Sequence, residues 1–352
     1  MRYKLLGRTG LRVSEAALGS GTFGTAWGWG ADAKTCRAMF DAYAEAGGNF
    51  IDTASGYQDG EAETIISDFL KSERANFVVN TKYSGPPFKG AALAATGNSR
   101  KSMMQSLESS LRRLGTDYVD IFMVHFADGT TPMEEMLRGF EDLVSAGKVN
   151  YVGFSDFPAW RVARAATLAE LTKLPVAAIQ IEYSLAERSP EREILPMAEG
   201  LGLGVTLWSV LGGGLLSGKY RKPGAEGRLG KGGGTVHQEQ GGQKSAILDA
   251  VEAVAKESGA TTAQVAIAWA RAWTGRLATS VIPIIGARTL EQLKDNLGAL
   301  AVELTPEQVQ RLADVSAVSL GFPHEMLGGE MIHRIGFAGQ WDRMEPQRWP
   351  VA

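Results

Sequence analysis

Eight short apolar runs alternate with amphipathic stretches along most of the chain, and this alternation restricts the possible folds more than any other feature. The runs are rich in Val, Ile and aromatic residues and are nearly continuous, which is typical of parallel strands covered on both faces. Strands that alternate with helices form a parallel sheet, and eight such units favour a closed (β/α)8 barrel over an open doubly wound sheet. In chain order the runs are AALGSG, NFIDTA, NFVVNTK, YVDIFMVH, YVGFSD, VAAIQIEY, GVTLWSV and SVIPIIG.

The predicted helices have recognisable boundaries. Ser, Thr, Asp or Pro stands where several of them begin, and Gly stands where several end. Ahead of the first run, the turn signal GRTG separates the apolar pieces 3–6 and 11–13 and predicts a small N-terminal β-hairpin. The helix boundaries are Asp32 and Gly47, Ser99 and Gly115, Pro132 and Gly147, and the start at Thr289.

No shift in composition divides the 352 residues, so we predict one α/β domain over residues 1–352. A Gly-rich stretch, 212–242, follows the seventh run, where a barrel places a long functional loop. For its middle, 230–236, a plain flexible insertion is an equal alternative. The last segment, 321–352, has little periodicity and is expected to form a tail or an extra loop near the rim.

The composition favours a protein of the cytoplasm. The net charge of −3 gives no electrostatic reason to bind nucleic acid or an acidic membrane. No signal peptide or membrane-spanning run is recognisable, and the single Cys36 suits a reducing compartment and a buried thiol on a helix. His237, His324 and His333 lack the spacing of metal ligands, so no metal site is expected.

Four chemically reactive side chains follow three successive strand-like runs. Asp52 and Tyr57 come after the second run, Lys82 ends the third, and His125 ends the fourth. The carboxyl ends of parallel strands meet at one rim, which carries the active site of (β/α)8 barrels. Each residue alone could be structural: a helix cap, a rim aromatic, half of an ion pair, or a core histidine. Together they predict a catalytic site.

The chemistry of these four residues is coherent. Asp52 would keep a buried Lys82 charged, and that ammonium is expected to lower the pKa of the Tyr57 phenol from its usual value of about 10. Such a phenol can give a proton to a carbonyl oxygen, and His125 can donate a hydrogen bond to the same oxygen. None of the four supplies hydride, which predicts a nicotinamide cofactor.

The segment GSGTFG at 19–24 has the spacing of a dinucleotide-binding fingerprint. That fingerprint requires a helix that opens at the glycines, whereas no helix is expected here before Asp32. We therefore reject a Rossmann interpretation. These glycines are expected to let the backbone approach a flat ligand at the end of the first strand.

With these motifs in view, the chain resembles the aldo-keto reductase family from the hairpin to about Ser316. The resemblance implies a (β/α)8 barrel that reduces aldehydes or ketones with NADPH, bound before the carbonyl substrate. It carries the family's catalytic tetrad to Asp52, Tyr57, Lys82 and His125, with the tyrosine as general acid. The beta subunits of voltage-gated potassium channels share this fold, so a partner role remains open. A Schiff-base lyase that uses Lys82 is a further alternative.

The same resemblance implies a cofactor site. GFSDF is similar to the family's GxSNF, so Asp156 stands where the family has asparagine, and one amide donor becomes an acceptor. A 2′-phosphate near Arg288 would favour NADP(H) over NAD(H). The implied cofactor-binding residues are Gly21, Thr22, Ser155, Asp156, Gln180, Trp208, Ser209, Leu211, Gly213, Ser217, Lys219, Arg228, Gly286, Ala287, Arg288, Gln292 and Asn296.

The carbonyl substrate itself is less constrained by the sequence. Aromatic residues near the predicted rim suit a flat or apolar carbonyl compound, although sugars also stack on tryptophan. The pattern defines neither the substrate nor the oligomeric state. The candidate substrate-binding residues are Trp27, Trp29, Phe88, Phe126 and Phe157.

Overall fold

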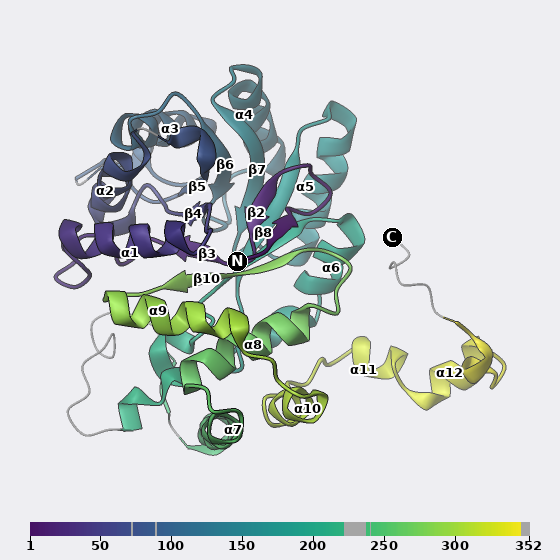
Figure 1. The fold of residues 1–352 in the computed structure, drawn as a ribbon. Coiled ribbons are helices and arrows are strands. Elements are labelled where there is room, and N and C mark those ends of the chain that lie inside the picture. Colours follow the sequence, from purple (N-terminus) through teal and green to yellow (C-terminus); the bar gives the residue numbers. More distant parts are fainter. Residues whose placement is uncertain (72, 89, 222–236, 240, 346–352) are drawn as a thin grey trace.

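The centre of the structure is a closed barrel of eight parallel strands (Figure 1). The computed structural model describes residues 1–71, 73–88, 90–221, 237–239 and 241–345. Each strand pairs with the next one in the sequence and the last pairs with the first, which confirms the predicted (β/α)8 fold. The strands are β3 (Ala17–Gly19), β4 (Phe50–Asp52), β5 (Val78–Tyr83), β6 (Val119–Val124), β7 (Val149–Ser155), β8 (Val176–Glu182), β9 (Gly204–Trp208) and β10 (Val281–Gly286).

Helices surround the barrel, and their predicted boundaries are confirmed. Asp32, Ser99 and Thr289 each accept a hydrogen bond from a backbone N–H of the first turn, and Gly115 ends its helix at φ +64°. Among the described helices, none is both long and apolar enough to cross a membrane. The helices are α1 (Ala33–Glu45), α2 (Glu61–Leu70), α3 (Arg100–Leu114), α4 (Met133–Ser145), α5 (Ala159–Thr172), α6 (Ile194–Leu201), α7 (Gly242–Ser258), α8 (Thr262–Thr274), α9 (Leu290–Gly298) and α10 (Pro306–Val315).

The predicted hairpin closes the amino-terminal end of the barrel. Its strands are β1 (Tyr3–Leu5) and β2 (Arg12–Ser14), which pair antiparallel. Leu6 and Val13 are fully buried in an apolar cluster with residues of the barrel strands, such as Phe50. The hairpin with its buried residues Leu6 and Val13 thus acts as a plug, and the carboxyl-terminal end of the barrel remains available for a ligand.

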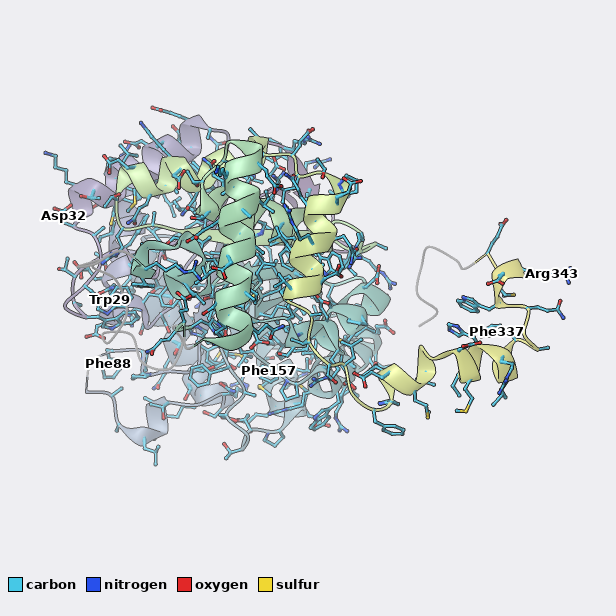
Figure 2. The ribbon with its side chains drawn as sticks, turned by 90° about the horizontal axis from the view of Figure 1, so that it is seen from below. Trp29, Asp32, Phe88, Phe157, Phe337 and Arg343 are labelled. Atoms are coloured by element: carbon cyan, nitrogen blue, oxygen red, sulfur yellow. The ribbon has the colours of Figure 1, made fainter. Side chains whose placement is uncertain are left out.

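Two segments extend the barrel. A 3-10 helix, Gly212–Ser217, follows β9, and the middle of the Gly-rich loop, 230–236, lies outside the described residues. At the other end of the chain, α11 (His324–Leu327) and α12 (Glu330–Gly336) project away from the barrel (Figures 1 and 2). Residues 321–345 therefore form a projecting tail with short helices.

The plug gives a direct test of the fold. Leu6→Ala removes a side chain with no exposed surface and leaves a cavity between hairpin and barrel. We expect the free energy of unfolding to fall by about 2–5 kcal/mol, measured by urea denaturation. Leu5→Ala, on the 52% exposed neighbour, is the control and should change it by less than about 0.5 kcal/mol. Equal effects of the two substitutions would show that the hairpin does not seal the barrel.

Candidate active site

A cavity of about 730 Å³ opens at the carboxyl-terminal end of the barrel. It is lined by residues at the ends of several strands, among them Gly19 of β3, Asp52 of β4, Gln180 of β8, Trp208 of β9 and Gly286 of β10. This is the rim at which (β/α)8 barrels carry their ligands. The volume lies in the range of small-molecule and cofactor sites.

Beneath the cavity lies a buried ion pair. Lys82 Nζ is 3.0 Å from Asp52 Oδ2 and donates at 2.6 Å to the backbone oxygen of Thr53. The Lys82 side chain has no exposed surface, and that of Asp52 is 3% exposed. Desolvation acts to lower the pKa of Lys82, but the charge of Asp52 and the hydrogen bonds from the ammonium outweigh it, so the pKa is raised. Lys82 is therefore a buried cation at neutral pH.

Two amides hold the second oxygen of Asp52. Asn80 Nδ2 donates to Oδ1 at 2.7 Å, and Gln180 Nε2 donates to the same atom at 2.8 Å. Asn80 is missing from the sequence-based site. It precedes Lys82 by two positions, and because side chains alternate along a strand, the two point to the same interior. That spacing, together with a polar residue in an apolar run, is a signal that could have identified it.

Tyr57 lies above the ion pair. Its hydroxyl oxygen is 3.4 Å from Lys82 Nζ, and its ring centroid is 4.9 Å from the same atom. Burial raises the pKa of Tyr57, and the opposing effect of the Lys82 ammonium is smaller. The expected net lowering of this pKa is therefore wrong, because desolvation of the phenolate outweighs the attraction of the cation. The phenol keeps its proton at neutral pH, as a general acid must.

The turn that carries Tyr57 is held by a neighbouring glutamine. Gln58, at φ +51°, donates through Nε2 to the backbone oxygens of Gly21 and Trp29, while its Oε1 accepts from the backbone N–H of Trp27. Left-handed backbone at a non-glycine residue persists only where surrounding contacts hold it. Gln58 thus ties the Tyr57 turn to the tryptophan loop, a role that the sequence does not reveal.

His125 follows β6 and lies beside Tyr57, with ring centroids 5.6 Å apart in an edge-to-face arrangement. Desolvation and the nearby Lys82 charge lower its pKa to about 3. The imidazole is therefore neutral at physiological pH. It can donate a hydrogen bond from a ring N–H but carries no positive charge.

Next to this group, Asp156 and Trp208 form one wall of the cavity. Trp208 Nε1 donates to Asp156 Oδ1 at 3.0 Å, and Ser155 Oγ donates to Asp156 Oδ2 at 3.0 Å. The Asp156 side chain faces the open cavity, but the surrounding protein desolvates it and raises its pKa to about 6, with Glu182 acting in the same direction. Ser155 itself is buried and does not line the cavity.

Farther along the cavity, the backbone after β9 forms a cradle. Three successive glycines, 212–214, have φ of +58°, +67° and +101°, a conformation in which a side chain is strained. Ser209 Oγ accepts from the N–H of Gly213 at 3.0 Å and fixes the turn. The N–H groups of Gly212 and Gly214 also donate within the turn, to the backbone oxygens of Ser209 and Leu211, so the turn offers a ligand space rather than free donors.

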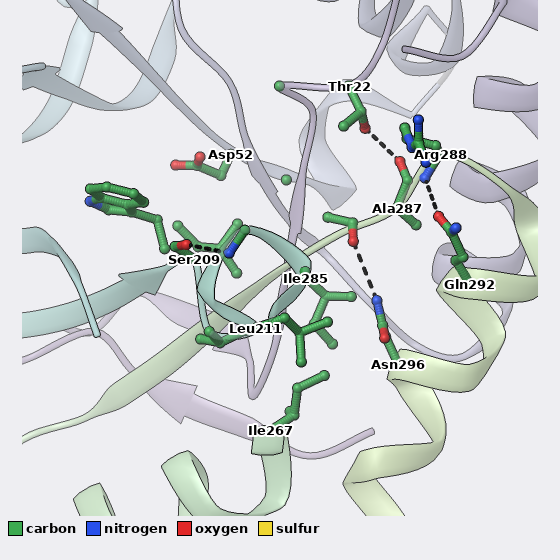
Figure 3. A pocket seen from close by; sticks show the side chains of 18 of the residues that line it. Thr22, Asp52, Ser209, Leu211, Ile267, Ile285, Ala287, Arg288, Gln292 and Asn296 are labelled. Carbon is green, nitrogen blue, oxygen red and sulfur yellow. Dashed lines mark hydrogen bonds between the residues drawn. The ribbon is translucent and has the colours of Figure 1, made fainter. Parts of the chain in front are cut away.

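The opposite wall is built from β10 and α9 (Figure 3). Thr22 Oγ1 donates to the backbone oxygen of Ala287, and the N–H of Arg288 donates to Gln292 Oε1 at 2.9 Å. Asn296 Nδ2 donates to the backbone oxygen of Gly286 at 3.3 Å. Arg288 lines the cavity, and no carboxylate among the described residues pairs with its guanidinium. It is therefore available to an anionic ligand.

The structure brings most of the predicted residues to one cavity. Lys82 lies below it, Phe88 is exposed and does not line it, and Phe157 is 3% exposed and packs against Phe154 (Figure 2 labels Phe88 and Phe157). Arg228 lies outside the described residues. The predicted residues that line the cavity are Gly21, Thr22, Trp27, Trp29, Asp52, Tyr57, His125, Phe126, Asp156, Gln180, Trp208, Ser209, Leu211, Gly213, Ser217, Lys219, Gly286, Ala287, Arg288, Gln292 and Asn296.

Other lining residues were not among the named site candidates, although the sequence did place the glycines of 19–24, including Gly19, near a ligand. They are mostly apolar, and they lie in core-like patterns that give no functional signal; Figure 3 labels two of them, Ile267 and Ile285. In the described part of the chain, no group of three or more His, Cys, Asp or Glu side chains is placed to hold a metal ion. The lining residues missed are Gly19, Val210, Gly214, Ala263, Ile267, Ile284, Ile285 and Asp295.

Comparison with known proteins agrees with this architecture. The sequence model of the aldo/keto reductase family matches residues 16–317. An aryl-alcohol dehydrogenase [NADP(+)] of Phanerodontia chrysosporium is 38% identical, over 97% of this chain and 92% of its own. The aldo-keto reductase ausK of Aspergillus calidoustus is 36% identical, over 93% and 85%. Norsolorinic acid reductase of Aspergillus flavus is 34% identical, over 90% and 81%.

The structure is a (β/α)8 barrel with a cavity at its carboxyl-terminal rim, and the matched family and relatives assign it to the oxidoreductases. The chain belongs to the aldo/keto reductase family.

Proposed function

We propose that this protein is an NADP(H)-dependent oxidoreductase that reduces aldehydes or ketones to alcohols, with Tyr57 as general acid. The observation that carries the proposal is the protonated Tyr57 hydroxyl, 3.4 Å from a buried ammonium and beside a neutral His125 in the rim cavity. A phenol in this setting can give its proton to an oxygen that gains negative charge. Lys82 stabilises the phenolate that remains.

The cavity suits a dinucleotide of this kind. Its reacting end must lie beside Tyr57, because hydride and proton go to the two adjacent atoms of one carbonyl group. Trp208 offers an indole face there, and Gly213 and Gly214, which carry no side chains, leave room for a ligand along the cavity wall. Arg288 supplies the charge that a 2′-phosphate requires, which supports NADP(H) over NAD(H). When bound, the cofactor supplies hydride, which no side chain of the site can do.

His125 and Tyr57 have different roles at the carbonyl oxygen: a hydrogen bond and a proton transfer. Both rings lie at the floor of the cavity, so one oxygen can accept from the Tyr57 hydroxyl and from a ring N–H of His125. The neutral state of His125 leaves the proton transfer to Tyr57. Orientation by His125 and acid catalysis by Tyr57 are thereby separate roles.

Aromatic residues at the mouth of the cavity support a flat aromatic carbonyl as substrate. The rings of Trp27 and Trp29 are 5.5 Å apart, and that of Trp27 meets the edge of Tyr57 at 6.4 Å. Phe126, 46% exposed, lines the same cavity. A ring between these side chains would bring its carbonyl substituent to Tyr57. Two relatives named for aryl-alcohol and norsolorinic acid substrates accord with this class.

The pairing of Lys82 with Asp52 argues against a Schiff-base lyase. A lysine must lose its proton to attack a carbonyl, whereas here the pKa is raised and the ammonium donates to Asp52, Thr53 and Tyr57. A non-catalytic role like that of channel beta subunits would retain cofactor binding without turnover. Oxidation of NADPH in the presence of a panel of aryl aldehydes separates that role from catalysis.

Tyr57→Phe tests the acid. Loss of the hydroxyl should lower kcat for carbonyl reduction by about 10²–10⁴-fold, because no other group at the carbonyl oxygen holds a transferable proton. The dissociation constant for NADPH, measured by quenching of tryptophan fluorescence, should change by less than about threefold. Tyr118→Phe, away from the cavity, is the control. If the Tyr57 variant keeps most of its activity, Tyr57 is not the acid.

Arg288→Ala tests the cofactor preference. Loss of a charge-assisted hydrogen bond should weaken NADPH binding by about 10- to 100-fold and NADH binding by less than about threefold. Lys294→Ala removes the same charge from the exposed face of α9 and should leave both affinities near those of the wild type. Titration calorimetry with the two cofactors gives the comparison. Equal weakening of NADPH and NADH would refute the 2′-phosphate assignment.

A further inference from the structure

Asp156 occupies an unusual position in the nicotinamide end of the cavity. It directly follows β7, adopts φ +53° and donates its backbone N–H to the backbone oxygen of Gln180 at 3.0 Å. Its side chain lines the cavity together with Gln180 and Trp208. Aspartate and asparagine tolerate left-handed backbone better than most residues, so either one fits this turn. The carboxylate is thus the distinctive feature of the position.

The polar groups at this end of the cavity are mainly acceptors. Gln180 must direct its NH2 group toward Asp52, because a carboxylate only accepts hydrogen bonds, and the same Nε2 donates to Thr206 Oγ1 at 3.1 Å. Among the described residues no donor reaches Gln180 Oε1, which remains for a ligand. Asp156 adds two carboxylate oxygens, already approached by Trp208 and Ser155.

A negatively charged wall of acceptors distinguishes the two redox forms of a nicotinamide. The oxidised ring carries a positive charge and the reduced ring is neutral, while both carry the same carboxamide NH2. The charged groups around Asp156 are Glu182, of the same sign, and Lys82, of the opposite sign. Because Lys82 is already paired with Asp52, Asp156 supplies a net negative charge where the ring would lie.

We propose that Asp156 selects the redox state of the bound cofactor: its carboxylate favours the oxidised, positively charged nicotinamide over the reduced one. This inference rests on the proposed function, since it requires a nicotinamide in the cavity. Preferential stabilisation of the oxidised form makes the bound reduced form a stronger hydride donor, by thermodynamic linkage. Asp156 thus biases the site toward reduction of the substrate.

The preference depends on pH with a definite sign. The pKa of Asp156 is raised to about 6, so the carboxylate is present above that pH and is lost as the pH falls through it. Preferential binding of the oxidised form should therefore be full near neutral pH and should decline in acid. The reduced nicotinamide ring is neutral, so the carboxylate of Asp156 does not attract it. The affinity for the reduced cofactor should therefore not change with pH through Asp156.

Asp156→Asn is the direct test. Asparagine keeps the shape, tolerates the backbone angle and can still accept from Trp208, so mainly the charge is removed. At about pH 7.5 the ratio of the NADP+ to the NADPH dissociation constant should rise about tenfold, almost entirely through weaker NADP+ binding. At about pH 5 the variant and the wild type should differ much less. Titration calorimetry on the protein without substrate measures both constants.

Asp295→Asn is a matched control. It removes the same charge from the opposite end of the cavity, where Asp295 accepts from Thr261 and Gln264. It should alter both dissociation constants equally, because the two redox forms share that half of the molecule. An unchanged ratio in Asp156→Asn would overturn the inference. If the wild type binds neither cofactor form, the proposed function fails instead.

Discussion

The buried ion pair between Lys82 and Asp52 is the interaction on which the functional end of the barrel depends. Adjacent strands β4 and β5 bring the two side chains together, and Asn80 and Gln180 satisfy the remaining oxygen of the carboxylate. A buried charge without such partners is strongly destabilising, whereas a fully hydrogen-bonded pair is tolerated. The pair therefore fixes a cation below Tyr57.

The Lys82 ammonium affects the pKa values of both His125 and Tyr57. It helps to keep His125 neutral, and it moderates the strong effect of burial on the Tyr57 phenol. Gln180 lies between this group and the Asp156 wall, because its NH2 group binds Asp52 while its oxygen remains for a ligand. Gln180 thus links the proposed proton donor to the proposed nicotinamide end of the cavity.

Much of this architecture could be predicted from the sequence because it depends on local rules. Periodicity, caps and turn residues define the strands, helices and hairpin, and residues that end successive parallel strands meet at one rim. The net pKa of Tyr57 could not be predicted, since it depends on the balance of burial against charge. The role of Gln58 and the core position of Phe157 could not be predicted either, because they depend on side-chain directions in three dimensions, whereas Asn80 left a signal in its spacing from Lys82.

The charge of Lys82 within the folded protein is the most direct test of this account. Nitrogen-15 NMR of labelled lysine, with the Lys82 signal assigned by its loss in Lys82→Met, reports whether the side chain is an ammonium or a neutral amine. The account predicts an ammonium from about pH 6 to about pH 10, because the raised pKa lies above the ordinary 10.5. Deprotonation with a midpoint below about pH 9, as burial alone would produce, would contradict it.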